Sequence, residues 1–287
     1  MKVRKFLMEN EKAQKFDMNN FKSSCLLVSP NNLGYSFSSE FEQIGNSFIE
    51  NNRKTEKKDP SGVLYFKSYD KYKEFVDFIE KSEQLKFTYI TPFQEGEKIF
   101  YRDVSIKELG KSEKTIKMLA CPVTFNGLSL WYEKSTAIYA IEPLTNEMRW
   151  DFQWDSTFYD YDTRSLEFVN KGHVEAPILV EIDGEVGNPA LSLYVEGELK
   201  QTIEFTVDIG ENEKFLYGSK ATDFYIKKQN SNGTIEDLYE YYDDLVLDFA
   251  NDNVMRLPKN KSCKLVLSAD NEITNAKVTI LTYYKAI

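Results

Sequence analysis

The sequence predicts a mainly β protein: an α+β amino-terminal half with one clear helix, followed by a carboxy-terminal β-sandwich. Short β-branched and aromatic runs recur between Gly, Asn and Pro turns along most of the chain. A single segment has helical periodicity instead. Charge also divides the chain, because residues 1–140 carry 22 basic and 19 acidic side chains, whereas residues 141–287 carry 14 and 27.

Length and composition indicate two folded domains. At about 100 to 200 residues per domain, 287 residues favour two, and we place them at 1–138 and 139–287. Hydrophobic residues make up 41% and aromatic residues 14%, which argues against long disorder. The strongly acidic second half speaks against nucleic-acid binding, because phosphate neutralisation needs a basic surface.

Cysteine usage and the amino terminus suggest folding in a cytoplasm. Cys25, Cys121 and Cys263 are odd in number and far apart, so they predict buried thiols rather than a disulfide framework or a zinc site. The first residues are too charged for a signal peptide, and no apolar run approaches the roughly 20 residues of a membrane helix.

The first 60 residues predict strands and loops. Residues 1–22 favour a strand followed by an arm, and terminal strands of this kind often pair with a neighbour. A short strand is expected at 25–28, and residues 29–60 offer Phe37, Phe41 and Ile44 as possible core anchors. The basic run 53–58 is interpreted as a solvated loop, with a phosphate or partner contact as the alternative.

The clearest helix is expected at residues 68–81. Tyr72, Phe75, Val76 and Ile79 follow helical spacing, and Ser68 can cap the amino end. Strands follow from Leu85 onward, with hairpin connections at 92–96 and 109–112 and a final apolar strand at 128–132. A helix followed by a β-meander gives an α+β domain.

Residues 133–165 form the expected crossover, in which aromatic and acidic residues alternate. We interpret them as an edge strand of the second domain. The alternatives are a carbohydrate platform with Trp150, Trp154 and Tyr159 as stacking residues, or a calcium loop, although the ligand order of an EF-hand is absent.

A strand, a turn and a second strand are expected at 177–194 and are interpreted as a β-hairpin entering the sandwich. Gly172 and Gly184 can take positive φ at the turns, and Pro177 and Pro189 belong at strand starts or edges. Further strands follow at sandwich-like spacing. Residues 235–244 predict a short helix or an acidic solvent loop.

No catalytic constellation is visible. His173 is the sole histidine, so a Ser/His/Asp or Cys/His triad has one possible base, and we interpret it as a turn residue. Acids such as Asp155, Asp160, Glu175 and Glu181 cannot be distinguished from ordinary surface acids as a glycosidase pair. We therefore expect no enzyme activity, no catalytic residue, no cofactor and no metal; a glycan hydrolase is the least favoured alternative.

Three landmarks together resemble a known family. The first is the helix segment and the strands after it, GVLYFKSYDKYKEFVDFIEKSEQLKFTYITP, YRDVSIKELGKSEKT and VTFNGLSLWYE. The second is a series of turn residues, Asn170, Gly172, Pro177, Gly184 and Pro189. The third is RLPKN, which precedes the closing strands LVLSAD and VTILTYYK. In this order they resemble the distal tail proteins of long-tailed bacteriophages of Gram-positive bacteria, and of related prophages and phage-tail-like bacteriocins (tailocins). Lys259 departs from the glycine that members commonly place after Leu-Pro.

The resemblance implies a structural role at the virion tail tip, with assembly in the host cytoplasm. It implies a ring, usually hexameric, built by an amino-terminal belt domain (1–138) and carrying an outward galectin-like β-sandwich (139–287). The implied partners are the tail tube protein, the tail-associated lysin or fibre hub, and receptor-binding or baseplate proteins, with no nucleic acid and no membrane. We expect the first strand and the helix to contribute to contacts between subunits. The runner-up is a carbohydrate-binding module for host cell walls.

Overall fold

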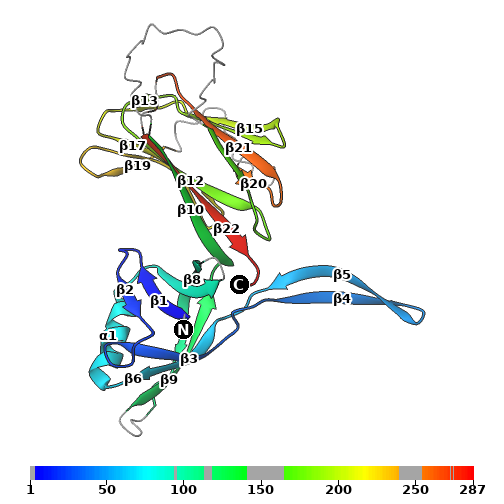
Figure 1. Cartoon of the computed structure of the whole chain (residues 1–287), viewed down its shortest axis with the longest axis vertical. Coiled ribbons are helices and arrows are strands. Elements are labelled where there is room, and N and C mark those ends of the chain that lie inside the picture. Colours follow the sequence, from blue (N-terminus) through cyan, green and yellow to red (C-terminus); the bar gives the residue numbers. More distant parts are fainter. Residues whose placement is uncertain are drawn as a thin grey trace. The chain divides into compact units, whose positions relative to one another are not determined.

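The computed structural model describes residues 4–93, 96–112, 118–140, 165–238, 254–271, 273 and 275–287. Strands dominate these residues, and α1 is the one helix among them, so the mainly β prediction is confirmed. The chain forms two compact units (Figure 1). Unit 1 is Met1–Glu133 with Tyr283–Ile287, and unit 2 is Lys134–Thr282. The domain bounds 1–138 and 139–287 stay a prediction.

The described residues of unit 1 form a β structure with one helix. Its elements are β1 (Lys5–Asn10), β2 (Lys15–Asp17), β3 (Cys25–Asn31), β4 (Ser36–Ile44), β5 (Ser47–Glu56), β6 (Ser61–Phe66), α1 (Tyr69–Glu80), β7 (Leu85–Phe93), β8 (Gly96–Leu109), β9 (Leu119–Gly127) and the start of β10 (Trp131–Ala140). The long strand β8 pairs with β7 and β10, and its later residues pair with β9, which leads to β6 and β3. The apolar sides of these strands enclose one core.

The predicted helix is confirmed with its cap. The Ser68 Oγ accepts a hydrogen bond from the backbone N–H of Lys71 at 3.4 Å, which satisfies one of the donors left free at a helix start. Phe75 is fully buried on the packed face, where its ring centroid lies 5.7 Å from that of Phe66. Helical spacing of apolar residues therefore fixed both the position and the packed face of α1.

Two predictions for the first 60 residues are wrong. The segment expected as an arm after the first strand is instead β2, which pairs back onto β1, while β7 covers the other edge of β1. The run Arg53–Glu56 is not a loop but the end of strand β5, which pairs with β4. The predicted hairpin from β7 into β8 is confirmed by the pairing of Phe93 with Gly96.

Unit 2 is a β-sandwich. Its elements, besides the end of β10, are β11 (Ser165–Val169), β12 (Ala176–Asp183), β13 (Val186–Gly187), β14 (Ala190–Val195), β15 (Glu198–Glu204), β16 (Asp208–Ile209), β17 (Lys214–Lys220), β18 (Asp223–Gln229), β19 (Ile235–Asp237), β20 (Arg256–Leu257), β21 (Ser262–Ser268) and β22 (Asn275–Tyr284). One sheet runs β19-β18-β17-β12-β22-β10, and the other runs β11-β21-β14-β15. Alternating residues of both sheets form one buried core.

The predicted hairpin at 177–194 is wrong in its pairing, although both strands exist. β12 pairs with β17, β20 and β22, whereas β14 pairs with β15 and β21 in the other sheet. The connection therefore crosses between the two sheets, because each strand buries one side against the opposite sheet. Gly184 has φ +97, as its turn requires, whereas Gly172 does not use positive φ. Pro177 lies in β12 and Pro189 directly precedes β14.

The three cysteines are buried free thiols, as predicted. Burial raises the pKa of the Cys25 thiol to about 12, so little reactive thiolate forms near neutral pH. Of the acidic segment 235–244, residues 235–237 form β19, and residues 239–244 lie outside the described part of the chain.

Candidate assembly surface

A long two-stranded arm is the most exposed feature of unit 1. It consists of β4 and β5, which pair only with each other among the described strands, and it projects away from the body of the unit (Figure 1). The turn is made by Gly45 and Asn46, and Gly45 has φ +62, which suits a two-residue hairpin turn. At about 3.4 Å per residue, strands of this length extend roughly 30 Å.

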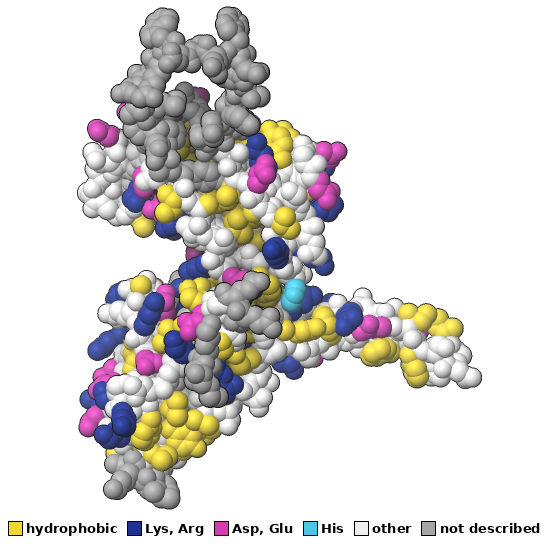
Figure 2. Space-filling view, in the orientation of Figure 1, with side chains coloured by type: hydrophobic (Ala, Val, Ile, Leu, Met, Phe, Trp, Pro, Cys, Tyr) yellow, Lys and Arg dark blue, Asp and Glu magenta, His cyan; other side chains and the backbone are white. Residues whose placement is uncertain are grey.

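The distal half of the arm presents large apolar side chains to solvent on both faces. Cross-strand pairing places Phe41 (65% exposed) and Phe48 (68% exposed) on one face as diagonal neighbours. Ile44 (55%) and Ile49 (48%) lie in the same way on the other face. Figure 2 shows hydrophobic side chains along the arm. The prediction that Phe41 and Ile44 are core anchors is therefore wrong.

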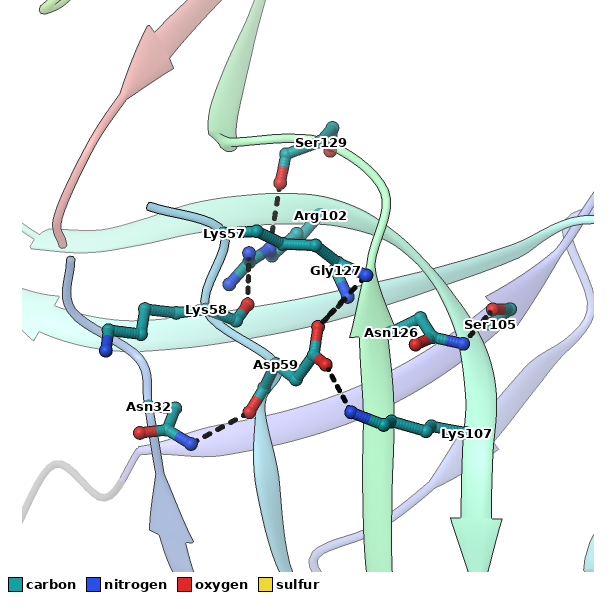
Figure 3. A network of polar contacts seen from close by, with 10 residues as sticks. All are labelled: Asn32, Lys57, Lys58, Asp59, Arg102, Ser105, Lys107, Asn126, Gly127 and Ser129. Atoms are coloured by element: carbon teal, nitrogen blue, oxygen red, sulfur yellow. Dashed lines mark hydrogen bonds and ion pairs between the residues drawn. The ribbon is translucent and has the colours of Figure 1, made fainter. Parts of the chain in front are cut away.

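The outgoing end of the arm is held by a buried arginine of β8 (Figure 3). Arg102 is 4% exposed, and its guanidinium donates hydrogen bonds to the carbonyl oxygens of Lys58 and Ser129 at 2.5 and 2.9 Å. Its Cζ also lies 5.7 Å from the centroid of the Trp131 ring. Burial lowers the pKa of Arg102, and the nearby Asp59 carboxylate opposes that shift.

The residue after Lys58 supplies a second link in Figure 3. The carboxylate of Asp59 accepts from the ammonium of Lys107 at 3.0 Å and from the backbone N–H of Gly127 at 3.1 Å, and it faces Lys57 at 3.3 Å. The hydrogen bond from Lys107, followed by those from Gly127 and Lys57, lowers the pKa of Asp59 to about 2. The carboxylate is thus charged throughout the ordinary pH range.

The incoming end of the arm is held to the same region. The side-chain amide of Asn32 donates to the carbonyl oxygen of Asp59 at 3.0 Å, and the Trp131 indole N–H donates to that of Leu33 at 3.0 Å. Gly127 leaves the necessary space, because a Cβ there would lie 2.2 Å from an Arg102 nitrogen and 2.8 Å from the Lys58 oxygen. Both ends of the arm are therefore fixed to the body.

A ring contact with the body of unit 1 is found in the proximal part of the arm. The Phe37 ring has the Arg53 guanidinium 3.8 Å and the Lys285 ammonium 5.3 Å from its centroid. Tyr35 meets the same ring edge to face at 5.1 Å. The body thus supports the arm near its base, and the apolar residues nearer the tip have no such cover.

The carbohydrate hypothesis is not tested by the structure. Trp150, Trp154, Tyr159, Asp155 and Asp160 all lie outside the described residues. Of the other acids considered, Glu181 pairs with Lys214 at 2.9 Å and Lys277 at 3.5 Å in unit 2, which lowers its pKa. That arrangement is an ion-pair network on a sheet rather than a tuned acid pair.

Unit 2 also contains an open groove beside β14 and β15. Glu175 lines it with residues of mixed charge such as Glu196, Lys200 and Arg256, and none of its described lining residues is aromatic. The described lining residues thus supply no aromatic ring for stacking on a sugar. The described residues also contain no His, Cys, Asp and Glu group that could hold a metal ion. No helix among them is long and apolar enough to cross a membrane.

Comparison with known proteins assigns a family to the amino-terminal part of the chain and a fold to the whole. Residues 5–128 match the family described as distal tail protein, N-terminal domain. The chain is similar to a component of the phage P2 baseplate in its activated conformation with calcium, at 15% identity, with 100% of both chains covered and a TM-score of 0.70. It is also similar to the Dit protein of phage SPP1, described as a paradigm of the hub adsorption apparatus in phages infecting Gram-positive bacteria, at 10% identity, 98% coverage of each chain and a TM-score of 0.56.

No curated protein sequence matches this chain. The two structural similarities show a shared fold at low sequence identity, and the family match covers most of unit 1. Residues 5–128 thus match a distal tail protein N-terminal domain, and the fold shared with the two phage proteins extends over the rest of the chain. The resemblance drawn from the sequence is confirmed for this amino-terminal domain.

The arm was not predicted from the sequence, although its turn has a local sequence signal. Gly45 and Asn46 lie between two segments that carry Phe and Ile residues, and a Gly-Asn pair in that position is typical of a two-residue hairpin turn. Nothing local indicated that the apolar residues point into solvent. Exposed apolar residues of this kind commonly mark an interaction site.

Proposed function

We propose that the protein is a structural hub of a phage tail tip, and that copies of it join into a ring through the arm. The distal tail protein domain and the baseplate and hub folds support the tail-tip role. The arm supports the ring, because it is an extended contact element fixed at its base and apolar near its tip. The hexameric number, and the choice of virion, prophage or tailocin, follow from the family resemblance alone.

The physical argument for assembly rests on the exposed part of the arm. A two-stranded ribbon is marginally stable by itself in water, so an apolar ribbon that no core covers gains most from a partner. A protruding arm that meets a different surface on the next copy makes a heterologous contact, and such contacts close into rings when the rotation permits. The arm has the form expected of such a connection.

The same proposal covers the partners and the location. A ring at the tail tip would connect the tail tube protein to the tail-associated lysin or fibre hub and to receptor-binding proteins, and it would assemble in the host cytoplasm. No catalytic step is part of this role. Support for a structural role comes from the family match over residues 5–128.

Light scattering on the full chain, alone and with the neighbouring tail protein, tests the proposal. We expect a mass equal to several copies in at least one of the two conditions. A monomeric mass in both conditions, at protein concentrations well above those at which other ring-forming proteins assemble, would contradict the ring. Electron microscopy of the assembled sample then gives the ring number.

A further inference from the structure

The hairpin of β18 and β19 in unit 2 has an exposed Asn-Gly pair at its turn. Asn232 and Gly233 are both exposed between the two strands. The backbone N–H of Asn230 donates to the carbonyl oxygen of Thr234 at 2.8 Å and closes the turn, and Gly233 has φ +84. This is the three-residue hairpin loop whose last residue takes positive φ, a conformation that glycine adopts without strain.

The side chain of Asn232 folds back over the peptide bond that follows it. Its Oδ1 accepts a hydrogen bond from the backbone N–H of Thr234 at 2.9 Å. An asparagine side chain that bonds the N–H two residues further on closes a ring around the peptide unit between them. The Cγ of Asn232 is therefore held beside the backbone nitrogen of Gly233, and the donor polarises the bond from Cγ to Oδ1.

The surroundings of Gly233 leave its backbone nitrogen accessible. No atom of the described chain beyond its two neighbours lies within 4 Å of the position that a Cβ on Gly233 would take. The N–H of Gly233 donates to the carbonyl oxygen of Asn230 at 2.8 Å, which is a neutral acceptor in the same exposed turn. Exposed loop tips open at a low free-energy cost, so this hydrogen bond gives the nitrogen little protection.

The other Asn-Gly pair of the sequence, Asn126 and Gly127, lies in the opposite environment. It belongs to β9, and Gly127 is buried. The side-chain amide of Asn126 donates to Ser105 Oγ at 3.1 Å, and the N–H of Gly127 donates to the Asp59 carboxylate at 3.1 Å (Figure 3). A charged acceptor holds an N–H more strongly than a neutral one, and its negative charge opposes loss of the proton.

We propose that Asn232 is a site of spontaneous deamidation in the folded protein and that Asn126 is protected from it. The backbone nitrogen of Gly233 loses its proton and attacks the Cγ of Asn232. The new C–N bond closes a succinimide ring, and the side-chain amide nitrogen leaves as ammonia. Water then adds to either carbonyl of the ring and opens it, which leaves aspartate or isoaspartate at that position. The reaction consumes only water, and asparagine is among the residues that heat degrades in this way.

Either product changes an edge of the sandwich. Both add a negative charge close to Glu236 and Asp237, and isoaspartate also lengthens the backbone of the turn. β19 is only three residues long, and it pairs with β18 from Gln229 opposite Ile235 onward. Loop length sets the register of a hairpin, and like charges on neighbouring positions weaken it. The modification should therefore loosen β19 as the protein ages.

Peptide mapping by mass spectrometry after incubation of the full-length protein at mildly alkaline pH tests the proposal. A parallel sample is unfolded in guanidinium chloride, where both Asn-Gly pairs are released from the fold, and there we expect Asn232 and Asn126 to convert at similar rates. In the folded sample Asn232 should convert at least about tenfold faster than Asn126, because opening a paired strand costs more free energy than opening a hairpin turn.

Asn232→Gln is the matched control, since it keeps the amide but would have to close a larger and slower-forming ring. Hydrogen exchange at the amide of Leu238, which donates to the carbonyl oxygen of Ile226 at 2.9 Å, reports on the end of β19. Exchange there should become faster in aged wild type and stay unchanged in aged Asn232→Gln. Equal conversion of the two asparagines in the folded sample would overturn the proposal, as would an unchanged Asn232 over a period in which the unfolded sample converts.

Discussion

Two β-hairpins of the molecule share a local structure and differ in burial. In unit 2, β17 and β18 pair along their whole length, and Phe215 and Tyr217 are buried in the sandwich core. In unit 1, β4 and β5 of the arm also pair from end to end, with one irregularity between Ser38 and Glu40, yet Phe41 and Phe48 are exposed. Strand pairing alone therefore does not show whether a hairpin stabilises the fold or binds a partner. The burial or exposure of its apolar residues shows it.

The difference also lies in how each hairpin is fixed. β17 is held along its length by neighbouring strands and by the rings that pack on it, such as Phe205 at 4.8 Å from Phe215. The arm is fixed at its base by the hydrogen bonds of Arg102, Asp59 and Trp131. Burial therefore stabilises the β17–β18 hairpin, and a polar network positions the arm.

The largest expected contrast comes from truncating one phenyl ring in each hairpin. Phe215→Ala should destabilise unit 2 by about 3 to 5 kcal/mol, because it leaves a cavity in a packed core. Phe48→Ala should change the free energy of unfolding by less than about 0.5 kcal/mol, since its ring contacts solvent. Denaturant titration of both variants measures the contrast. A large loss for Phe48→Ala in the monomer would mean that the arm belongs to the core.

The next contrast concerns the base of the arm. Gly127→Ala should destabilise unit 1 by about 2 to 4 kcal/mol, because the new methyl group would overlap the Arg102 guanidinium and break its hydrogen bonds. Gly34→Ala is the matched control, since no atom lies within 4 Å of the added Cβ. Thermal unfolding compares the two. Similar melting temperatures would show that the network does not hold the arm.

The smallest expected effect is a dependence of the melting temperature on acidic pH. The pKa of Asp59 is about 2, below its ordinary value of 3.8, so the carboxylate stabilises the folded state fully above the ordinary value. That stabilisation is lost as pH falls from 3.8 to 2. The melting temperature of the wild type should therefore fall more steeply in this window than that of Asp59→Asn. Parallel curves would rule out the role given to Asp59.

Sequence reasoning succeeded where the signal was local. The helix α1 was predicted with its cap because Ser68 and the spacing around Phe75 act within a few residues. The pairing of β12 and β14 was predicted wrongly, because the choice of sheet depends on strands far along the chain. Burial of Arg102 had no local signal either, since Tyr101 and Asp103 flank it in an ordinary alternating strand.

The exposure of the apolar residues on the arm was the feature that local sequence signals predicted least. The sequence offers Phe41 and Ile44 as possible anchors, because apolar residues are usually buried. Their exposure follows from where the chain turns away from the body, which the contacts of Asn32 and Asp59 decide. The family resemblance supplied the role, and the structure supplied the element that suits it.

The most direct test of the account compares the solution mass of the wild type with that of a Phe41→Ser, Phe48→Ser double variant. Both are measured at equal concentration under the conditions in which the wild type assembles. We predict that the double variant stays monomeric while its melting temperature as a monomer is unchanged, because the two rings contact a second copy and not the core. A double variant that assembles to the same mass and to the same extent as the wild type would contradict the central claim.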